Sequence, residues 1–200
     1  MGKGVCFSFE WVRRYVVGFL VMICIFCVSA VRAEEIIFDS ESVFVELGIA
    51  ETLSVYGSYL FMNPTGQAVS QTIIYPFPVD SNHEFPHEIS VVPDHAEKVS
   101  FKRYAKGIGF PVKIPPHDSL RCRIRYVQRI KEQKGTYILK TTQHWDRPLR
   151  YSELRLLIPQ EHVFSFISYE SDTVIVDAGR LNYHFSFRDF MPKKDLDFEW

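Results

Sequence analysis

The sequence of 200 residues is long enough for one large domain or two small ones, and its 46% hydrophobic and 24% charged residues lie near the averages of globular proteins. These values exclude a wholly disordered, collagen-like or disulfide-dense chain. The formal net charge of -1 combines a basic segment of 33 residues, at +3, with a following 167 residues at -4, and this acidic remainder makes nucleic acid an unexpected partner.

The first expected element is an export signal. An uncharged run of 17 residues, Tyr15 to Val31, follows the basic pair Arg13-Arg14 and ends at Val31-Arg32-Ala33, a pattern that signal peptidases cut. We predict a signal peptide over residues 1–33, cleaved after Ala33. The alternative is an uncleaved signal anchor, because spans of about 17 to 25 residues can cross a bilayer. Either form places the body outside the cytoplasm, periplasmic or secreted, and the uncleaved form would tether it to the inner membrane through residues 15–31.

The cysteines agree with a cleaved leader. Cys6, Cys24 and Cys27 fall within the first 33 residues, which leaves Cys122 alone in the body. One cysteine cannot close an internal disulfide, so we expect the domain to fold without one.

The body of the chain, residues 34–200, is expected to consist of strands. Apolar and polar residues alternate in short runs separated by proline, glycine and asparagine, whereas helical spacing of apolar residues is almost absent. The pattern predicts one all-β domain, a two-sheet antiparallel β-sandwich of the immunoglobulin-like kind. In chain order the expected strands are Ser42–Leu47, Leu53–Phe61, Ala68–Tyr75, Glu88–Val92, Lys98–Tyr104, Phe110–Ile114, Leu120–Ile130, Thr136–Trp145, Tyr151–Ile158, Val163–Tyr169, Thr173–Val176, Leu181–Arg188 and Asp195–Trp200.

A zinc-peptidase pattern precedes the fourth of these strands. The segment His83-Glu84-Phe85-Pro86-His87 matches H-E-x-x-H, in which a helix would bring two histidines onto one face while the glutamate acts as general base. Pro86 opposes a helix, so we interpret the segment as a polar loop that enters a strand. A metal-dependent hydrolase using His83, Glu84 and His87 is kept as an alternative function. A loop-held zinc ion could use His83, His87, Asp94 and His95; otherwise no cofactor is expected.

The clearest alternating run, Leu120–Ile130, carries arginines on the face opposite its apolar residues, at Arg121, Arg123, Arg125 and Arg129. Guanidinium groups form charge-assisted hydrogen bonds with phosphates and carboxylates, so this face is a candidate binding surface for another envelope protein or an anionic envelope polymer. The simpler interpretation is a solvated strand face balanced by nearby acidic residues. On the inner face, Cys122 is expected to be a small buried hydrophobe rather than a nucleophile.

A β-hairpin is expected from this run and the next, Thr136–Trp145, because a link of about five residues containing Gly135 joins them. In this register Lys140 and His144 lie beside the arginines and extend the candidate binding surface. The expected pairs are Ile130 with Tyr137, Cys122 with Trp145 and Arg123 with His144.

The last element, Asp195–Trp200, alternates acidic and apolar residues up to the final tryptophan and is expected to be a strand of the sandwich. The alternative is the terminal strand of a small outer-membrane β-barrel, for which about eight strands of about ten residues would fit the length. All 11 prolines lie in the body, and several runs are not two-faced as barrel strands must be, which favours the sandwich.

A family resemblance rests on four segments: Tyr59–Thr65, Ile73–Pro78, Tyr126–Gln128, and Tyr137–Thr142 with Trp145. Together they resemble uncharacterised exported bacterial β-sandwich domains, a family of unknown function. The resemblance implies an extracytoplasmic sandwich and transfers no active-site residue. We therefore expect a non-enzymatic structural or interaction module of the bacterial cell envelope.

Overall fold

The computed structural model describes residues 36–48, 51–94 and 97–200. The chain divides into two units, Met1–Glu35 and Ile36–Trp200. The expected signal peptide, its cleavage point at Ala33 and the uncharged run of residues 15–31 lie outside the described residues. No helix in the described ranges has the length and apolar character needed to cross a membrane.

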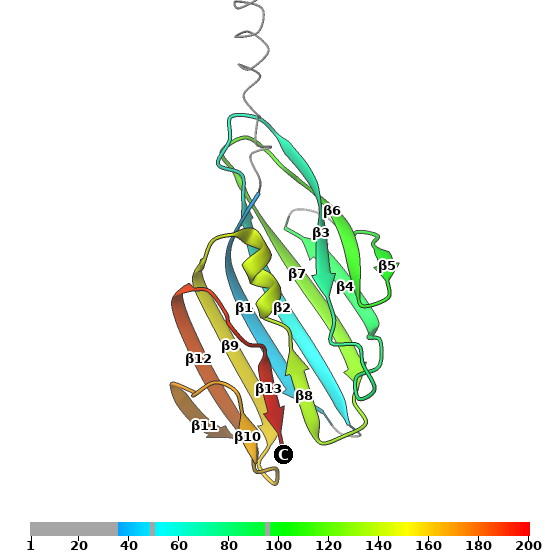
Figure 1. Ribbon diagram of the computed structural model, residues 1–200, viewed down its shortest axis with the longest axis vertical. Helices are drawn as coiled ribbons and strands as arrows, with labels where there is room; N and C mark the ends of the chain where they lie inside the picture. Colours follow the sequence, from blue (N-terminus) through cyan, green and yellow to red (C-terminus); the bar gives the residue numbers. More distant parts are fainter. Residues whose placement is uncertain (1–35, 49–50, 95–96) are drawn as a thin grey trace, which may run out of the picture. The chain divides into compact units, whose positions relative to one another are not determined.

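A long sheet of seven strands forms one layer of the fold (Figure 1). Adjacent strands are antiparallel except for β1 and β9, which run parallel. The order across the sheet is β11 (Thr173–Asp177), β12 (Arg180–Phe190), β9 (Leu149–Pro159), β1 (Ile37–Leu47), β2 (Thr52–Met62), β7 (Ser119–Arg129) and β4 (His87–Pro93).

Two three-stranded sheets and one 3-10 helix form the second layer, over one face of the long sheet (Figure 1). The described strands thus form an all-β sandwich, as predicted, and the sheets are open at their edges rather than closed into the barrel considered as an alternative. The sandwich differs from the expected two sheets, because the second layer is split into two separate sheets. Its elements are β3 (Val69–Pro76), β6 (Gly107–Ile114) and β5 (Lys102–Tyr104) in one sheet, β10 (Phe166–Ile167), β13 (Leu196–Glu199) and β8 (Lys134–Tyr137) in the other, and helix η1 (Lys140–Trp145).

Alternation along the central strands builds the interior between the layers. The inner face of the long sheet joins both small sheets in one apolar cluster, to which β6 contributes Phe110 and β13 contributes Phe198. Burial of each such side chain stabilises the fold by about 1.5–3 kcal/mol, so the alternating pattern determines which face of a strand points inward. On β2 the buried residues are those predicted: Leu53, Val55, Gly57, Tyr59 and Phe61.

Gly57 makes room for a tyrosine on its own strand. Residues 57 and 59 both point inward, since alternate residues of a strand share a face. A methyl group at Gly57 would overlap the phenol ring of Tyr59, which lies over this position. The missing side chain therefore lets the Tyr59 hydroxyl reach Tyr75 of β3 and Tyr137 of β8 in the second layer.

The predicted hairpin of residues 120–130 with 136–145 is wrong. β7 lies between β2 and β4, whereas β8 pairs with β13 in the other layer, and residues 140–145 form η1. A carboxylate oxygen of Asp195 accepts hydrogen bonds from the backbone N–H groups of Leu139 and Lys140, both at 2.9 Å, and this holds the chain in a turn after β8. The actual partners are Tyr59 and Pro93 for Cys122, Ser58 and Val92 for Arg123, and His83 for Ile130.

Candidate functional site

The outer face of the long sheet carries a row of arginines along β7, termed here the arginine face. Cys122, Ile124, Tyr126 and Gln128 point into the core between them, so every guanidinium lies on the solvent side, with Val127 between Arg125 and Arg129 on the outer face. Arg121, Arg123 and Arg125 follow one another at roughly 7 Å, and Arg129 lies about 13 Å beyond Arg125, because a strand rises about 3.3 Å per residue. The arginine face consists of Arg121, Arg123, Arg125 and Arg129, all of them exposed.

One carboxylate, Asp94, lies near two of these arginines. Arg123 Nη2 lies 3.3 Å from Asp94 Oδ1, and Arg121 Nε lies 4.0 Å from Asp94 Oδ2. Arg121 also donates to Ser58 Oγ at 3.2 Å. Exposed ion pairs of this kind contribute only about 0–1 kcal/mol, so a ligand with a well-placed anionic group can displace them.

The other two arginines, Arg125 and Arg129, have no acidic partner among the described residues. The guanidinium of Arg125 lies 5.1 Å from the ring centre of Tyr56, in a cation–π contact. Within the part of the chain that the structure describes, no carboxylate lies within ion-pair distance of Arg125 or Arg129. These two guanidinium groups are therefore free to bind an anion.

A groove of about 640 Å³ crosses the outer face over β1, β2, β7 and β4. Both Arg123 and Arg125 line it, together with the Tyr56 ring and one acidic residue, Glu88. Ser42, Ser58 and Ser90 add hydroxyl groups to the lining. Hydroxyl groups both donate and accept hydrogen bonds, so the groove can bind a molecule that carries acidic and hydroxyl groups.

On the opposite half of the same face, the charges pair with one another. Glu153 accepts hydrogen bonds from Arg155 Nη2 at 2.7 Å and faces His184 Nε2 at 3.0 Å. Although partial burial raises the pKa of Glu153, the contacts with Arg155 and His184 outweigh it and lower the pKa below 4.5. Arg180 pairs likewise with Glu46. Arg188 of β12 contacts the Tyr151 ring instead, so this half of the face also contains one arginine without a carboxylate partner among the described residues.

Lys140 and His144 do not belong to the arginine face, contrary to the prediction. Both lie on η1, in the layer that covers the opposite side of the long sheet. Lys140 Nζ lies 3.6 Å from Asp195 Oδ2, and His144 is exposed. The error follows from the false hairpin, since only a strand at residues 136–145 would place these side chains beside Arg123.

The H-E-x-x-H segment is not helical. It consists of an isolated bridge at His83, an irregular stretch and the start of β4 at His87, as expected of a loop that enters a strand. His83 is buried with its Nδ1 2.9 Å from Asp80 Oδ1, whereas His87 is exposed. The backbone therefore lacks the helical spacing on which the zinc motif depends.

Asp94, another proposed metal ligand, is far from His83 along the sheet. His83 bridges Ile130 at one end of β7, whereas Asp94 lies beside Arg121 near the other end. His95 lies outside the described residues. Among the residues that the structure describes, no group of three His, Cys, Asp or Glu side chains could hold a metal ion.

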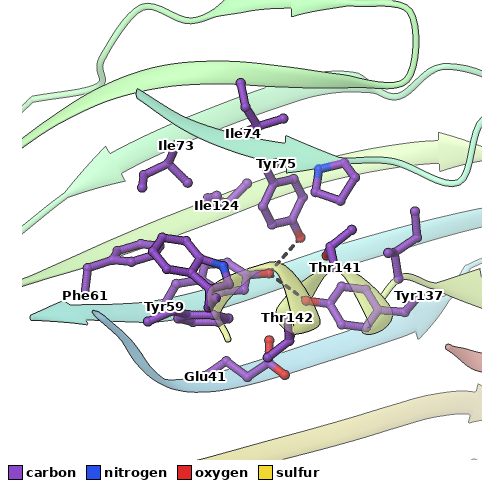
Figure 2. Close-up of a pocket in the computed structure, with 14 residues that line it drawn as sticks. Glu41, Tyr59, Phe61, Ile73, Ile74, Tyr75, Ile124, Tyr137, Thr141 and Thr142 are labelled. Carbon is purple, nitrogen blue, oxygen red and sulfur yellow. Dashed lines mark hydrogen bonds between the residues drawn. The ribbon is translucent and has the colours of Figure 1, made fainter. Parts of the chain in front are cut away.

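A buried polar cluster, which was not predicted from the sequence, lies on the inner face of the long sheet (Figure 2). Glu41 of β1 is only 5% exposed, and Ser152 Oγ of β9 donates to its Oε1 at 2.9 Å. The Tyr59 hydroxyl lies 2.7 Å from that of Tyr75 and 3.0 Å from that of Tyr137. Burial raises the pKa of Glu41 from 4.5 to about 7, more than the hydrogen bonds from Ser152 and Tyr137 lower it.

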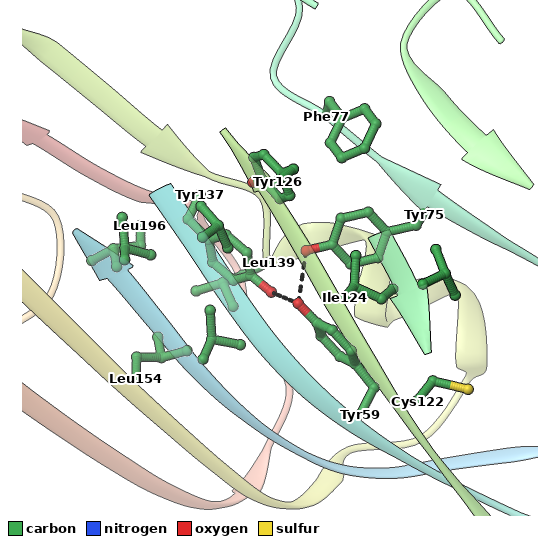
Figure 3. Close-up of a cluster of buried hydrophobic side chains, with 14 of the residues drawn as sticks. Tyr59, Tyr75, Phe77, Cys122, Ile124, Tyr126, Tyr137, Leu139, Leu154 and Leu196 are labelled. Atoms are coloured by element: carbon green, nitrogen blue, oxygen red, sulfur yellow. Dashed lines mark hydrogen bonds between the residues drawn. The ribbon is translucent and has the colours of Figure 1, made fainter. Parts of the chain in front are cut away.

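The phase of β1 contains the signal that could have located this carboxylate. Val43 and Val45 are buried, and Glu41 continues their alternation by one further step. The predicted strand began at Ser42, one residue too late to include Glu41. Figure 3 shows the three tyrosines among apolar side chains such as Leu154, so the polar cluster borders the apolar core.

Comparison with known families supports the expected resemblance. Residues 118–198, from the start of β7 into β13, match a family described as a domain of unknown function (DUF4424). The predicted likeness to uncharacterised domains is thereby confirmed. None of the curated proteins matches the chain.

Two solved structures share the fold. A candidate nutrient-binding protein from Legionella pneumophila subsp. pneumophila str. Philadelphia 1 aligns with a TM-score of 0.66 at 14% identity, over 82% of this chain and 66% of that protein. An M1 zinc metallopeptidase from Deinococcus radiodurans aligns with a TM-score of 0.52 at 10% identity, over 82% of this chain and 42% of the peptidase. The chain thus spans less than two thirds of either protein. At these identities the likeness shows a shared β-sandwich fold alone.

Proposed function

We propose that the protein is an exported, non-enzymatic interaction module of the bacterial cell envelope and that its arginine face binds an anionic envelope polymer. The observation that carries the proposal is the outer groove, in which Arg125 has no carboxylate partner and Arg123 has only a weak one. Such guanidinium groups offer bidentate hydrogen bonds to carboxylates and phosphates. The described acidic residues compensate these charges only in part.

The groove suits a polymer with sugar-like hydroxyls better than an acidic protein. Its lining contains hydroxyls from Ser42, Ser58 and Ser90, which can exchange hydrogen bonds with ligand hydroxyls. The Tyr56 ring offers an apolar surface beside Arg125. The groove also crosses four neighbouring strands, so an extended chain can contact several of these groups at once.

Location outside the cytoplasm is the second part of the proposal. Its support is the N-terminal sequence, in which the uncharged run Tyr15 to Val31 follows Arg13-Arg14. Fractionation of cells that produce the full chain should recover the protein in the periplasm, the medium or the inner-membrane fraction. Recovery in the cytoplasm alone would contradict export.

Binding of polygalacturonate, a polysaccharide with one carboxylate per sugar, tests the arginine face. We expect binding to weaken steeply as salt rises, because salt screens exposed charges. The double variant Arg123→Ala, Arg125→Ala should bind at least about tenfold more weakly, which corresponds to about 1.4 kcal/mol. The measurement is calorimetric titration at low and at physiological ionic strength.

A double variant of equal charge change is the control. Lys106→Ala with Lys113→Ala removes two exposed positive charges from the small sheet that contains β6 and should leave the affinity unchanged. Equal losses in both double variants would show a general charge effect and contradict a specific surface. Binding of polyglutamate but not polygalacturonate would replace the polymer by an acidic protein as partner.

A further inference from the structure

The cavity beside the buried polar cluster contains a carboxylate within aromatic surroundings. Glu41 and the hydroxyls of Tyr59, Tyr75 and Tyr137 point toward the same space (Figure 2). The cavity has a volume of about 50 Å³. One buried water needs roughly 10–15 Å³ by the same measure, so the cavity can hold a small polar head group.

Glu41 has no cationic partner among the described residues. The groups that hydrogen-bond to it, Ser152 and Tyr137, are neutral, and burial raises its pKa to about 7. An ionised carboxylate that is buried without a counter-ion is costly. A cationic ligand in the cavity would supply the missing charge.

Three further aromatic rings form a wall of the cavity. The ring centres of Phe38, Phe61 and Trp145 lie 5.3 to 5.8 Å from one another, and all three side chains line the space. The faces of aromatic rings attract cations, and aromatic cages are a common means of recognising ammonium groups. The aromatic wall and the Glu41 carboxylate thus both favour a cationic ligand.

The lining reaches the surface between β3 and η1. Half-buried Ile138 lies just before η1 and half-buried Thr141 lies on it, whereas the exposed side chain of Ile74 lies on the other face of β3, beside Gly109. This rim is largely apolar. An alkyl chain can therefore follow Ile138 while a charged head group reaches Glu41.

We propose that this cavity binds the head group of a primary alkylamine, with the ammonium against Glu41 and the alkyl chain at the rim formed by Ile138 and Thr141. A primary ammonium has three N–H donors, which match the carboxylate and the tyrosine hydroxyl oxygens. The cavity lies on the opposite side of the long sheet from the arginine face, so this site does not depend on polymer binding.

Calorimetric titration of the full chain with n-propylammonium chloride at about pH 8 tests the proposal, since amines with a pKa near 10.4 are protonated there. We expect binding to the natural protein and at least about tenfold weaker binding to Glu41→Gln. The matched variant Glu161→Gln makes the same chemical change at an exposed position and should bind normally. The uncharged 1-propanol should bind far more weakly.

Affinity should also depend on pH in a defined direction. The ammonium requires ionised Glu41, so affinity should fall about a hundredfold from about pH 8 to about pH 5 as the carboxyl, with its pKa of about 7, becomes protonated. The other titratable groups facing it are Tyr59, Tyr75 and Tyr137. Burial raises the pKa of each tyrosine, so all three stay neutral over this range.

Three outcomes would overturn the site: equal binding by Glu41→Gln, equal affinity for 1-propanol and the amine, or no binding by the natural protein. Trp145→Leu supplies a second variant at the cavity wall, and undiminished binding by it would exclude the aromatic contribution. Binding of N-acetyl-lysine amide with the affinity of propylammonium would identify the natural ligand as a lysine side chain of a partner protein. Binding of propylammonium alone would identify the natural ligand as a free amine.

Discussion

Replacing Glu41 with glutamine should stabilise the protein at neutral pH and leave its stability nearly unchanged in mild acid. Burial raises the pKa of this carboxyl from 4.5 to about 7 in the folded protein. The folded state therefore binds a proton more tightly than the unfolded chain does. Between these two pKa values folding takes up a proton, so stability falls as pH rises through this window.

The size of the effect follows from the two pKa values. Each unit of difference corresponds to about 1.4 kcal/mol, so the interval between 4.5 and about 7 gives a penalty of about 3 kcal/mol above pH 7. Glutamine does not ionise, and its carbonyl can still accept the hydrogen bond from Ser152. The stability gain of Glu41→Gln should thus grow from near zero below pH 4.5 to about 3 kcal/mol above pH 7.

Urea unfolding of both proteins at a series of pH values measures this gain directly. Glu153→Gln is a control of opposite sign, because contacts with Arg155 and His184 outweigh burial and lower the pKa of Glu153 below 4.5. The stability that ionised Glu153 provides is present above pH 4.5 and is lost as pH falls through its lowered pKa. A Glu41→Gln gain that does not change between mild acid and neutrality would refute the reasoning.

Three further predictions concern single residues of the fold. Gly57→Ala should destabilise the protein by about 1–3 kcal/mol in urea unfolding, because the new methyl overlaps the Tyr59 ring; an unchanged midpoint would show that the ring moves freely. The Cys122 thiol should resist alkylation in the native protein and react in urea, since it is buried and burial, with the charge of Asp94, raises its pKa to about 12; native labelling at the rate of a free thiol would contradict this. Asp195→Ala should cost about 1–2 kcal/mol, because the buried backbone N–H of Leu139 loses its acceptor, and hydrogen exchange at that amide should quicken.

The sequence was sufficient to predict which residues of the central strands point into the core, because this depends only on neighbouring residues. On β2, the alternation around Val55 and Tyr59 identified the buried face, and on β7 it placed the arginines outside. Burial of each inward apolar side chain stabilises the folded state, so a local pattern of period two is sufficient to determine which face points inward. The arginine half of the candidate surface was predictable for the same reason.

Partner choice between strands could not be predicted in this way. The chain turns after β8 because Asp195, 56 residues from Leu139, accepts its backbone N–H, and no local pattern contains that contact. The parallel pairing of β1 with β9 likewise joins Ser40 to Tyr151 across most of the domain. Lys140 and His144 were misplaced because their surface depended on a pairing rather than on alternation.

Alternation also explains how one sheet can supply two separate sites. On β1, Glu41 points into the cavity and Ser42 into the outer groove, and on β7 buried Ile124 stands between the outward Arg123 and Arg125. A register shift of one residue would exchange these faces, burying guanidinium groups without partners and exposing the apolar set. Because that exchange is so costly, the same burial energy that selects the fold also holds the carboxylate inside and the arginines outside.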